Sequence, residues 1–178
     1  MHFEHIPANS SWDHNSVYWR TLGAPWGGLL SSAPDLALFY QAMLHGGALS
    51  PPESPRMRRP KRILQPENAA LMTRHWHSAR RDTCHDGSPA SAWGLGFRLQ
   101  HKELKFGFGS GAAVPEPSTT SSVEAEGLIF GHHGASGAMA WADPQSGLSV
   151  AVLTTEPDMC YSAEFNTLCD IIVSDCAS

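Results

Sequence analysis

Histidines are the residues in this chain whose type and spacing best suit acid–base chemistry. His132 and His133 follow the apolar segment Leu128–Phe130 and are flanked by Gly131 and Gly134. An imidazole gains and loses a proton near neutral pH, so a ring at the end of a strand could move protons to and from a substrate. The competing interpretation is that the two rings only end the strand and hydrogen-bond to the backbone.

A second group of histidines, with one cysteine, has residue types that bind metal ions. It comprises His75, His77, Cys84 and His85. Residues two apart in an extended segment face the same side, and imidazole and thiolate are zinc ligands. Third and fourth ligands at the spacing of a known motif are absent from the sequence. Partly exposed histidines are therefore the favoured interpretation, and no metal or other cofactor is predicted.

Two further segments partly match catalytic or phosphate-binding motifs. Ser136 lies in Gly134–Ala138, but the first glycine comes one place too early for a nucleophile elbow and strands follow instead of a helix. Gly107–Gly111 is rich in glycine, but no helical pattern and no Lys-Ser or Lys-Thr follows it, as a phosphate-binding loop requires. Neither segment is predicted to form a site.

Three segments of the chain occur in the order found in a known hydrolase family. Asn15–Ala37 contains Pro-Trp-Gly-Gly, Trp93–Phe97 reads Trp-Gly-Leu-Gly-Phe, and Leu128–Pro144 contains His-His-Gly. Together they resemble the C-terminal part of the serine β-lactamase and penicillin-binding-protein-like family. The resemblance is to its class C and esterase-like branch, where His-x-Gly stands in for Lys-Thr-Gly on the strand edging the cleft. It runs from about Asn15 to Thr155.

The resemblance implies roles for individual residues near that cleft. His132 matches the Lys or His of the third motif and Gly134 matches its glycine, while the backbone N–H of Ala135 would be one of two donors to the developing oxyanion. His133, at the middle position, and Trp26 are assigned by resemblance to the substrate-binding wall. Because consecutive strand residues point to opposite faces, only one of the two imidazole rings is expected to face the cleft.

The activity implied by the resemblance is acyl transfer through a serine nucleophile. In the family, the Ser of Ser-x-x-Lys attacks a carbonyl carbon while the Lys and the Tyr of Tyr-x-Asn move protons. This sequence contains neither motif, and the nearest approach, Ser78–Arg81, ends in an Arg, which stays protonated. We therefore expect the C-terminal portion of a β-lactamase-like serine hydrolase, beginning after both motifs and inactive alone. The alternative is a noncatalytic binding or interaction protein derived from that fold.

The histidine at the first position of the third motif also bears on the substrate. The family acts on small-molecule esters, lactams and peptide amides, and a Lys at this position attracts the carboxylate that β-lactams and peptidoglycan stems carry. An imidazole is mostly neutral near pH 7, whereas an ammonium group is fully charged. His132 therefore favours esters or uncharged amides.

Composition describes a globular chain and argues against several classes of partner. Among 178 residues, 42% are hydrophobic and 16% charged, and the formal charge of −5 disfavours nonspecific binding to nucleic acid. No apolar run reaches the roughly 18 residues of a membrane helix, and Met1–His5 lacks the regions of a signal peptide. No membrane association is predicted, and a cytoplasmic location is expected. The four cysteines lack Cys-x-x-Cys spacing, which favours free buried thiols.

Helical periodicity predicts three helices. Residues 1–14 show no period and form an irregular lead-in, and ordered structure is expected to begin in a loop near Tyr18. The first helix follows the capping residue Ser32 and stops at Gly46, and a short helix spans Pro66–Thr73. The last helix spans about Ser162–Val173. Its apolar face is formed by Phe165, Leu168, Cys169 and Ile172.

Apolar segments predict the strands, and in Trp93–Leu99 the apolar residues alternate with Gly94, Gly96 and Arg98. Trp93–Leu99 is predicted to form one half-buried strand, followed by strands over Leu128–His133, Ala138–Asp143 and Leu148–Thr155. A tight antiparallel turn at Pro144–Gly147 joins the last two. Residues 107–127 are poor in large apolar groups and predict a flexible insertion.

These elements predict an α+β fold, with an antiparallel sheet, a C-terminal helix packed on one face and a helical segment. Such an arrangement is that of an incomplete β-lactamase or transpeptidase-like domain spanning 15–178. Because the resemblance covers only the C-terminal part of the family, one sheet edge is expected to be exposed. Exposed edges promote association, so self-association through this edge is predicted.

Overall fold

The computed structural model describes residues 16–25, 27, 29–49, 61–74, 76, 92–100, 128–134, 137–156, 159 and 162–176. The chain divides into two compact units, Met1–Ser32 and Ala33–Ser178, which are described separately. The predicted lead-in at 1–14 and the predicted insertion at 107–127 lie outside the described residues.

The first unit contains one short helix where the sequence predicted a loop. Helix α1 spans Val17–Leu22, so the expectation of a loop near Tyr18 was wrong. Its start is capped by Ser16, whose hydroxyl oxygen accepts a 3.1 Å hydrogen bond from the backbone N–H of Trp19. Gly23 ends the helix with a left-handed backbone (φ +62°). A capped start and a glycine stop are enough to define this single turn and a half.

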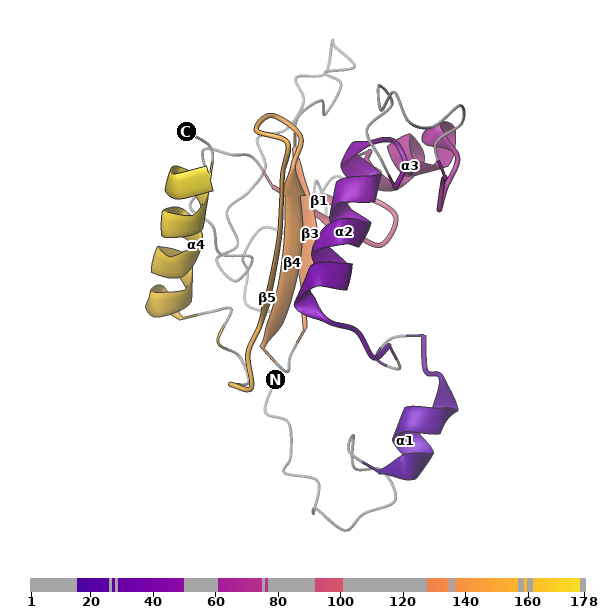
Figure 1. Cartoon of the computed structure of the whole chain (residues 1–178), viewed down its shortest axis with the longest axis vertical. Helices are drawn as coiled ribbons and strands as arrows, with labels where there is room; N and C mark the ends of the chain where they lie inside the picture. Colours follow the sequence, from indigo (N-terminus) through magenta and orange to yellow (C-terminus); the bar gives the residue numbers. More distant parts are fainter. Residues whose placement is uncertain are drawn as a thin grey trace. The chain divides into compact units, whose positions relative to one another are not determined.

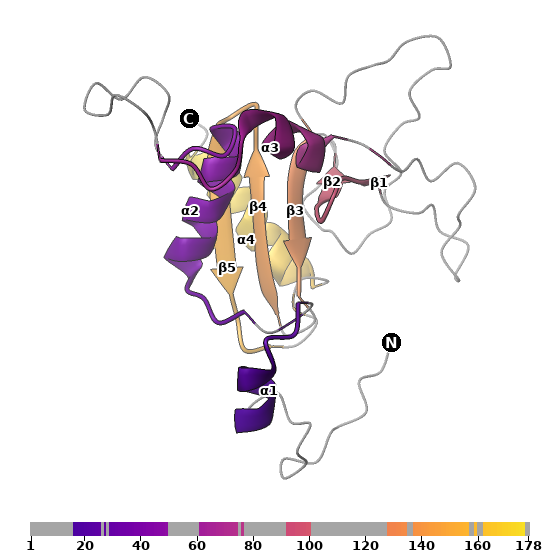
Figure 2. The same cartoon turned by 90° about the vertical axis from the view of Figure 1, so that its right-hand side faces the viewer.

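The second unit is built on a five-stranded antiparallel sheet, seen nearly edge-on in Figure 1, with the strand order β1-β2-β3-β4-β5, which Figure 2 shows face-on. Its long strands are β3 (Ile129–His133), β4 (Ala138–Asp143) and β5 (Leu148–Leu153). All three were predicted from the sequence, and each pairs with its sequence neighbour. The predicted α+β fold with an antiparallel sheet is confirmed.

The segment predicted as one strand over Trp93–Leu99 is instead a tight hairpin. Strands β1 (Ala92–Trp93) and β2 (Arg98–Gln100) pair antiparallel, with Trp93 opposite Arg98. The turn closes through the backbone N–H of Gly94, which donates to the carbonyl of Phe97 at 2.8 Å, and Gly96 takes a φ of +88°. A left-handed glycine reverses the chain where alternation alone suggested continuation.

Helices cover both faces of the sheet, as Figure 2 shows, with α2 and α3 in front and α4 behind. Helix α2 spans Ala33–Leu44 and α3 spans Pro66–Thr73, which confirms both predicted helices. The last helix, α4, spans Ala163–Cys176 and extends slightly beyond the predicted end. None of the helices within the described ranges is long and apolar enough to cross a membrane.

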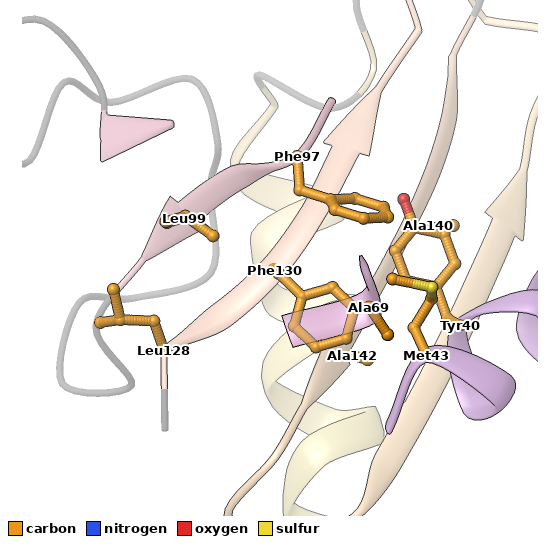
Figure 3. Packing of buried hydrophobic residues seen from close by; sticks show 9 residues of the cluster. All are labelled: Tyr40, Met43, Ala69, Phe97, Leu99, Leu128, Phe130, Ala140 and Ala142. Carbon is orange, nitrogen blue, oxygen red and sulfur yellow. The ribbon is translucent and has the colours of Figure 1, made fainter. Parts of the chain in front are cut away.

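The core between α2 and the sheet combines aromatic rings with alanines. Tyr40 stacks on Phe130 of β3 with ring centroids 6.0 Å apart, and it meets Phe97 edge-on at 5.7 Å (Figure 3). On β4, Ala140 and Ala142 face the same cluster and are almost completely buried. Small side chains on the central strand let the helix lie close to the sheet, so the rings fill the remaining space.

The opposite face of the sheet packs against α4 through larger side chains. Trp141 and Met139 of β4 form a buried cluster with Phe165 and Cys169 of the helix. Three members of the predicted apolar face are buried or half-buried, but Leu168 is 38% exposed, so its assignment to the buried face was wrong. Val173, which the prediction did not include, packs against the cluster together with Ile172, while Phe165 and Cys169 are its fully buried members on the helix.

The predicted turn between β4 and β5 is confirmed, and a buried carboxylate holds it. Asp143 is 2% exposed. Its Oδ1 accepts from the backbone N–H of Gln145 at 2.8 Å, and its Oδ2 accepts from the hydroxyl of Ser146 at 2.7 Å. Gly147 completes the turn with a φ of +70°. A carboxylate that accepts hydrogen bonds from the following residues is a common way of fixing a turn.

Candidate functional site

The end of strand β3 carries the His-His-Gly sequence, and a close contact with β4 fixes its position. A side chain at Gly131 would place its Cβ 2.5 Å from the carbonyl oxygen of Ala140 and 2.6 Å from the Cβ of Trp141. Real Cβ atoms do not approach other atoms so closely. Glycine at this position therefore lets β4 lie close beside the strand, immediately before His132.

Beyond Gly131, β3 is paired on one side only within the described part of the chain. The ladder with β2 ends at the pair Arg98 and Gly131, whereas the ladder with β4 continues through His132 opposite Ala140. The N–H of Gly134 donates to the carbonyl of Ala138 at 2.7 Å. Antiparallel pairs alternate in direction, so the backbone N–H and C=O of His133 point away from β4, toward the side where β2 has ended.

The two imidazole rings lie together, although their residues point to opposite faces of the strand. The register places His132 on the α2 face and His133 on the α4 face, yet the ring centroids are 5.5 Å apart and the planes differ by only 19°. The two rings therefore lean toward each other and lie nearly parallel. His132 is exposed whereas His133 is half-buried, and the expectation that only one ring faces the cleft stays a prediction.

The indole of Trp93 lies beside the first imidazole, on the side where β2 ends. Its centroid is 5.4 Å from that of His132, with 49° between the planes. The imidazole of His132 is exposed, and 37% of the Trp93 surface is exposed as well. The two rings and His133 form one partly open aromatic surface, which we call the β3-end surface.

Tyr40 of α2 contacts the end of β3 from the buried side of the sheet. Its side chain is buried, and burial raises the pKa of its hydroxyl well above the ordinary value, an effect that a hydrogen bond with the backbone of His132 partly offsets. Sequence reasoning placed this tyrosine on the apolar face of its helix and assigned it no part in the site. A hydroxyl on an otherwise apolar helix face was the available signal, because a buried tyrosine hydroxyl usually finds a partner.

The turn after the motif is tight, and it contains one of the predicted site residues. The N–H of Gly137 donates to the carbonyl of Gly134 at 3.0 Å, and Gly137 has a φ of +89°. A Cβ at Gly137 would collide with the Oγ1 of Thr154 and the carbonyl of Glu156. Ala135, the predicted oxyanion donor, lies inside this turn but outside the described residues, as does Ser136.

The structure thus brings together three of the five predicted site residues. These are His132, His133 and Gly134, whereas Trp26 and Ala135 lie outside the described residues. The second histidine group also lies outside them, and no cluster of three or more potential metal ligands occurs in the described parts of the chain. Of the cysteines, Cys169 is a buried free thiol as predicted, but Cys176 is exposed.

Comparison with known proteins assigns this fold and motif to a family. The sequence profile of the β-lactamase family matches residues 2–163, so the chain belongs to the β-lactamase family. Proteins named "Putative D-alanyl-D-alanine carboxypeptidase" from Salmonella enteritidis PT4 and Salmonella newport are each 26% identical to it over 162 residues. That alignment covers 88% of this chain and 30% of each relative. The chain therefore spans about a third of the length of these relatives. No solved structure matches it.

Proposed function

We propose that this chain forms one wall of the active site of a serine hydrolase that transfers the acyl group of an ester, lactam or peptide amide. The observation that carries the proposal is the position of the His-His-Gly sequence. It ends a strand of a β-lactamase-family domain, at the point where pairing with β2 stops, and it carries two stacked imidazole rings, of which that of His132 is exposed. The family and the names of the Salmonella relatives supply the reaction class.

Each residue of this wall has a chemical task in the proposed reaction. His132 exchanges a proton with the substrate or the nucleophile, because its ring is exposed and imidazole suits general acid–base catalysis near neutral pH. His133 stacks on that ring and limits its orientations. Gly134 leaves the strand edge bare, so the scissile carbonyl lies against the backbone with its oxygen toward the N–H of Ala135.

The nucleophile of the proposed reaction comes from outside these 178 residues. The sequence contains no Ser-x-x-Lys and no Tyr-x-Asn, and the relatives are about three times as long as the matched segment. Without an activated nucleophile, a cleft wall binds but does not cleave. The same observation favours a second candidate function, a binding protein that uses the cleft wall without catalysis.

The test compares the chain alone with a version that includes a nucleophile segment. The purified 178-residue chain should hydrolyse neither a chromogenic β-lactam nor a p-nitrophenyl ester above background. A longer version, read from an upstream frame that encodes both missing motifs, should turn over the ester. His132→Ala should lower its kcat/KM on the order of 10²-fold, whereas His45→Ala, a half-buried histidine at the end of α2, should not.

The outcomes separate the two candidate functions. Turnover in the longer version that depends on His132 supports the hydrolase. A longer version that binds the ester but never cleaves it favours the binding protein. Turnover by the 178-residue chain alone, abolished by one serine substitution, would contradict the placement of the nucleophile.

A further inference from the structure

Trp93 is a large apolar side chain that the structure places against the candidate catalytic imidazole. Its ring centroid lies 5.4 Å from that of His132, and more than a third of its surface remains exposed. The indole therefore combines an exposed surface with a position beside the ring that the proposed reaction uses.

The backbone around Trp93 is held rigidly on two sides. Its carbonyl accepts a 3.0 Å hydrogen bond from the N–H of Trp76, and the N–H of Leu95 donates to the carbonyl of Met72 at 2.9 Å. A Cβ at Gly94 would collide with that same carbonyl, so the hairpin is pressed against the end of α3. A platform anchored in this way offers a fixed surface to a ligand at little cost in conformational entropy.

The chemistry of the Trp93 indole restricts which groups can bind against its face. The face of an aromatic ring carries partial negative charge, so it attracts cations and apolar groups but disfavours a carboxylate, which would also lose its hydration. The neighbouring group is the imidazole of His132, whereas the commoner Lys-Thr-Gly motif would place an ammonium group there. An apolar, uncharged chain can cover both rings at once.

We propose that Trp93 is a specificity-determining residue of the β3-end surface, selecting substrates whose acyl chain is apolar and uncharged. This proposal rests on the proposed acyl-transfer function, because it takes His132 to mark the reacting end of the substrate. It goes beyond that function by naming the residue and the chemical class that it selects.

The test measures binding to the 178-residue chain itself, so it does not depend on turnover. Hexanamide is titrated while NMR follows the imidazole resonances of His132, and adipic acid monoamide, which has the same chain with a terminal carboxylate, serves as the charged match. The proposal expects saturable shifts with hexanamide and at least several-fold weaker binding of the monoamide. Trp93→Ala should raise the Kd of hexanamide on the order of tenfold, and Trp93→Phe should recover most of the affinity.

A second exposed tryptophan provides the matched control. Trp76 is 48% exposed, but its indole N–H donates to the carbonyl of Leu71 at 2.6 Å and the Arg74 guanidinium lies 4.1 Å from its ring centroid. Trp76→Phe should leave the Kd of hexanamide unchanged. Equal affinities for the two amides, equal affinities of the native and Trp93→Ala chains, or no saturable shift at His132 would each overturn the proposal.

The proposed function can fail separately. A longer version that binds esters without His132-dependent cleavage would contradict the hydrolase and leave these binding constants as they are. Conversely, His132-dependent cleavage by the longer version, combined with an unchanged preference of Trp93→Ala for hexanamide over the monoamide, would refute only the role of Trp93.

Discussion

The hydroxyl of Tyr40, buried beneath the sheet on α2, has a hydrogen bond with the backbone of His132 at the exposed end of β3. One residue belongs to the core and the other to the candidate site. The ring of Tyr40 is in turn stacked on Phe130, two positions before His132 on the same strand. The position of the motif therefore depends on how α2 packs, which connects the stability of the core to the geometry of the site.

Removing only the hydroxyl tests this connection. Tyr40→Phe keeps the aromatic packing and should lower the free energy of unfolding by about 1 kcal/mol, the usual net value of such a bond. It should also shift the backbone amide resonance of His132. Urea denaturation and amide NMR measure the two effects, and Tyr18→Phe, at a 48% exposed position, is the control. An unchanged His132 amide would show that the bond does not persist in solution.

Two buried groups make the fold sensitive to alkaline pH. Burial, and to a smaller extent the Asp170 carboxylate, raise the pKa of Cys169 from 9.0 to about 12, and burial also raises the pKa of Tyr40. The folded state therefore keeps protons that the unfolded state loses. This stability is fully present below about pH 9 and should decline above it, at up to about 1.4 kcal/mol per pH unit for each group.

Denaturant unfolding at a series of pH values checks this expectation. Cys169→Ala should flatten the decline between pH 9 and 10, after allowance for the cavity that it creates, and Tyr40→Phe should flatten it above pH 10. Cys176→Ala, at an exposed position, should leave the curve of the native chain unchanged. Identical pH slopes in all of these chains would mean that neither buried group titrates as its surroundings imply.

Much of the fold follows from local sequence patterns, and the departures occur where tertiary contacts decide. The strands β3, β4 and β5 are apolar segments bounded by glycine or proline, and α3 begins with proline, so their sequence alone indicates them. The alternation of apolar and small residues in Trp93–Leu99 suggested one strand. The left-handed backbone of Gly96 reverses the chain there, and the alternation does not reveal it.

The candidate site was predictable in part, for a similar reason. His132 and His133 could be placed at the end of a strand from sequence. Their stacked rings could not, since alternation along a strand places the two side chains on opposite faces. The contributions of Tyr40 and Trp93 depend on which helix and which hairpin reach the end of β3, and no local pattern encodes such contacts.

The close contact between Gly131 and β4 predicts that position 131 does not tolerate any larger residue. Gly131→Ala would drive a methyl group into the carbonyl of Ala140 and the side chain of Trp141, so β4 must move. The free energy of unfolding should fall by about 2 kcal/mol or more. Gly147→Asn is the matched control, because Asn tolerates a φ of +70° and nothing lies within 4 Å of the new Cβ. Thermal unfolding of both variants provides the comparison, and equal stabilities would contradict the close strand packing.

The outer surface of α4 and the strand β5 should make the 178-residue chain prone to self-association. Ile171 is 52% exposed and Leu168 is 38% exposed on the helix, and Leu153 of β5 is 44% exposed. Within the described residues, β5 pairs only with β4. Exposed edges and apolar faces favour association and dye binding. Ile171→Lys should reduce both, measured by sedimentation and hydrophobic-dye fluorescence, whereas Glu164→Lys on the same helix should not. A native chain that is monomeric and binds no dye would refute this expectation.

The charge at position 132 should decide between neutral and carboxylate-bearing substrates in any version that turns over. His132→Lys places an ammonium group, which is fully charged near pH 7, on the exposed end of β3. A cation close to the bound substrate attracts a carboxylate and gives nothing to an uncharged ester. We expect the ratio of kcat/KM for a β-lactam to that for a neutral ester to rise on the order of tenfold in His132→Lys. His132→Ala should lower both values without that change in ratio, and His133→Ala should cause a smaller loss, because its ring only supports its neighbour. Raising the ionic strength should weaken the new preference of His132→Lys, which separates an effect of charge from one of shape. An unchanged ratio in His132→Lys would mean that this side chain does not face the substrate, and the assignment of the site would have to be abandoned.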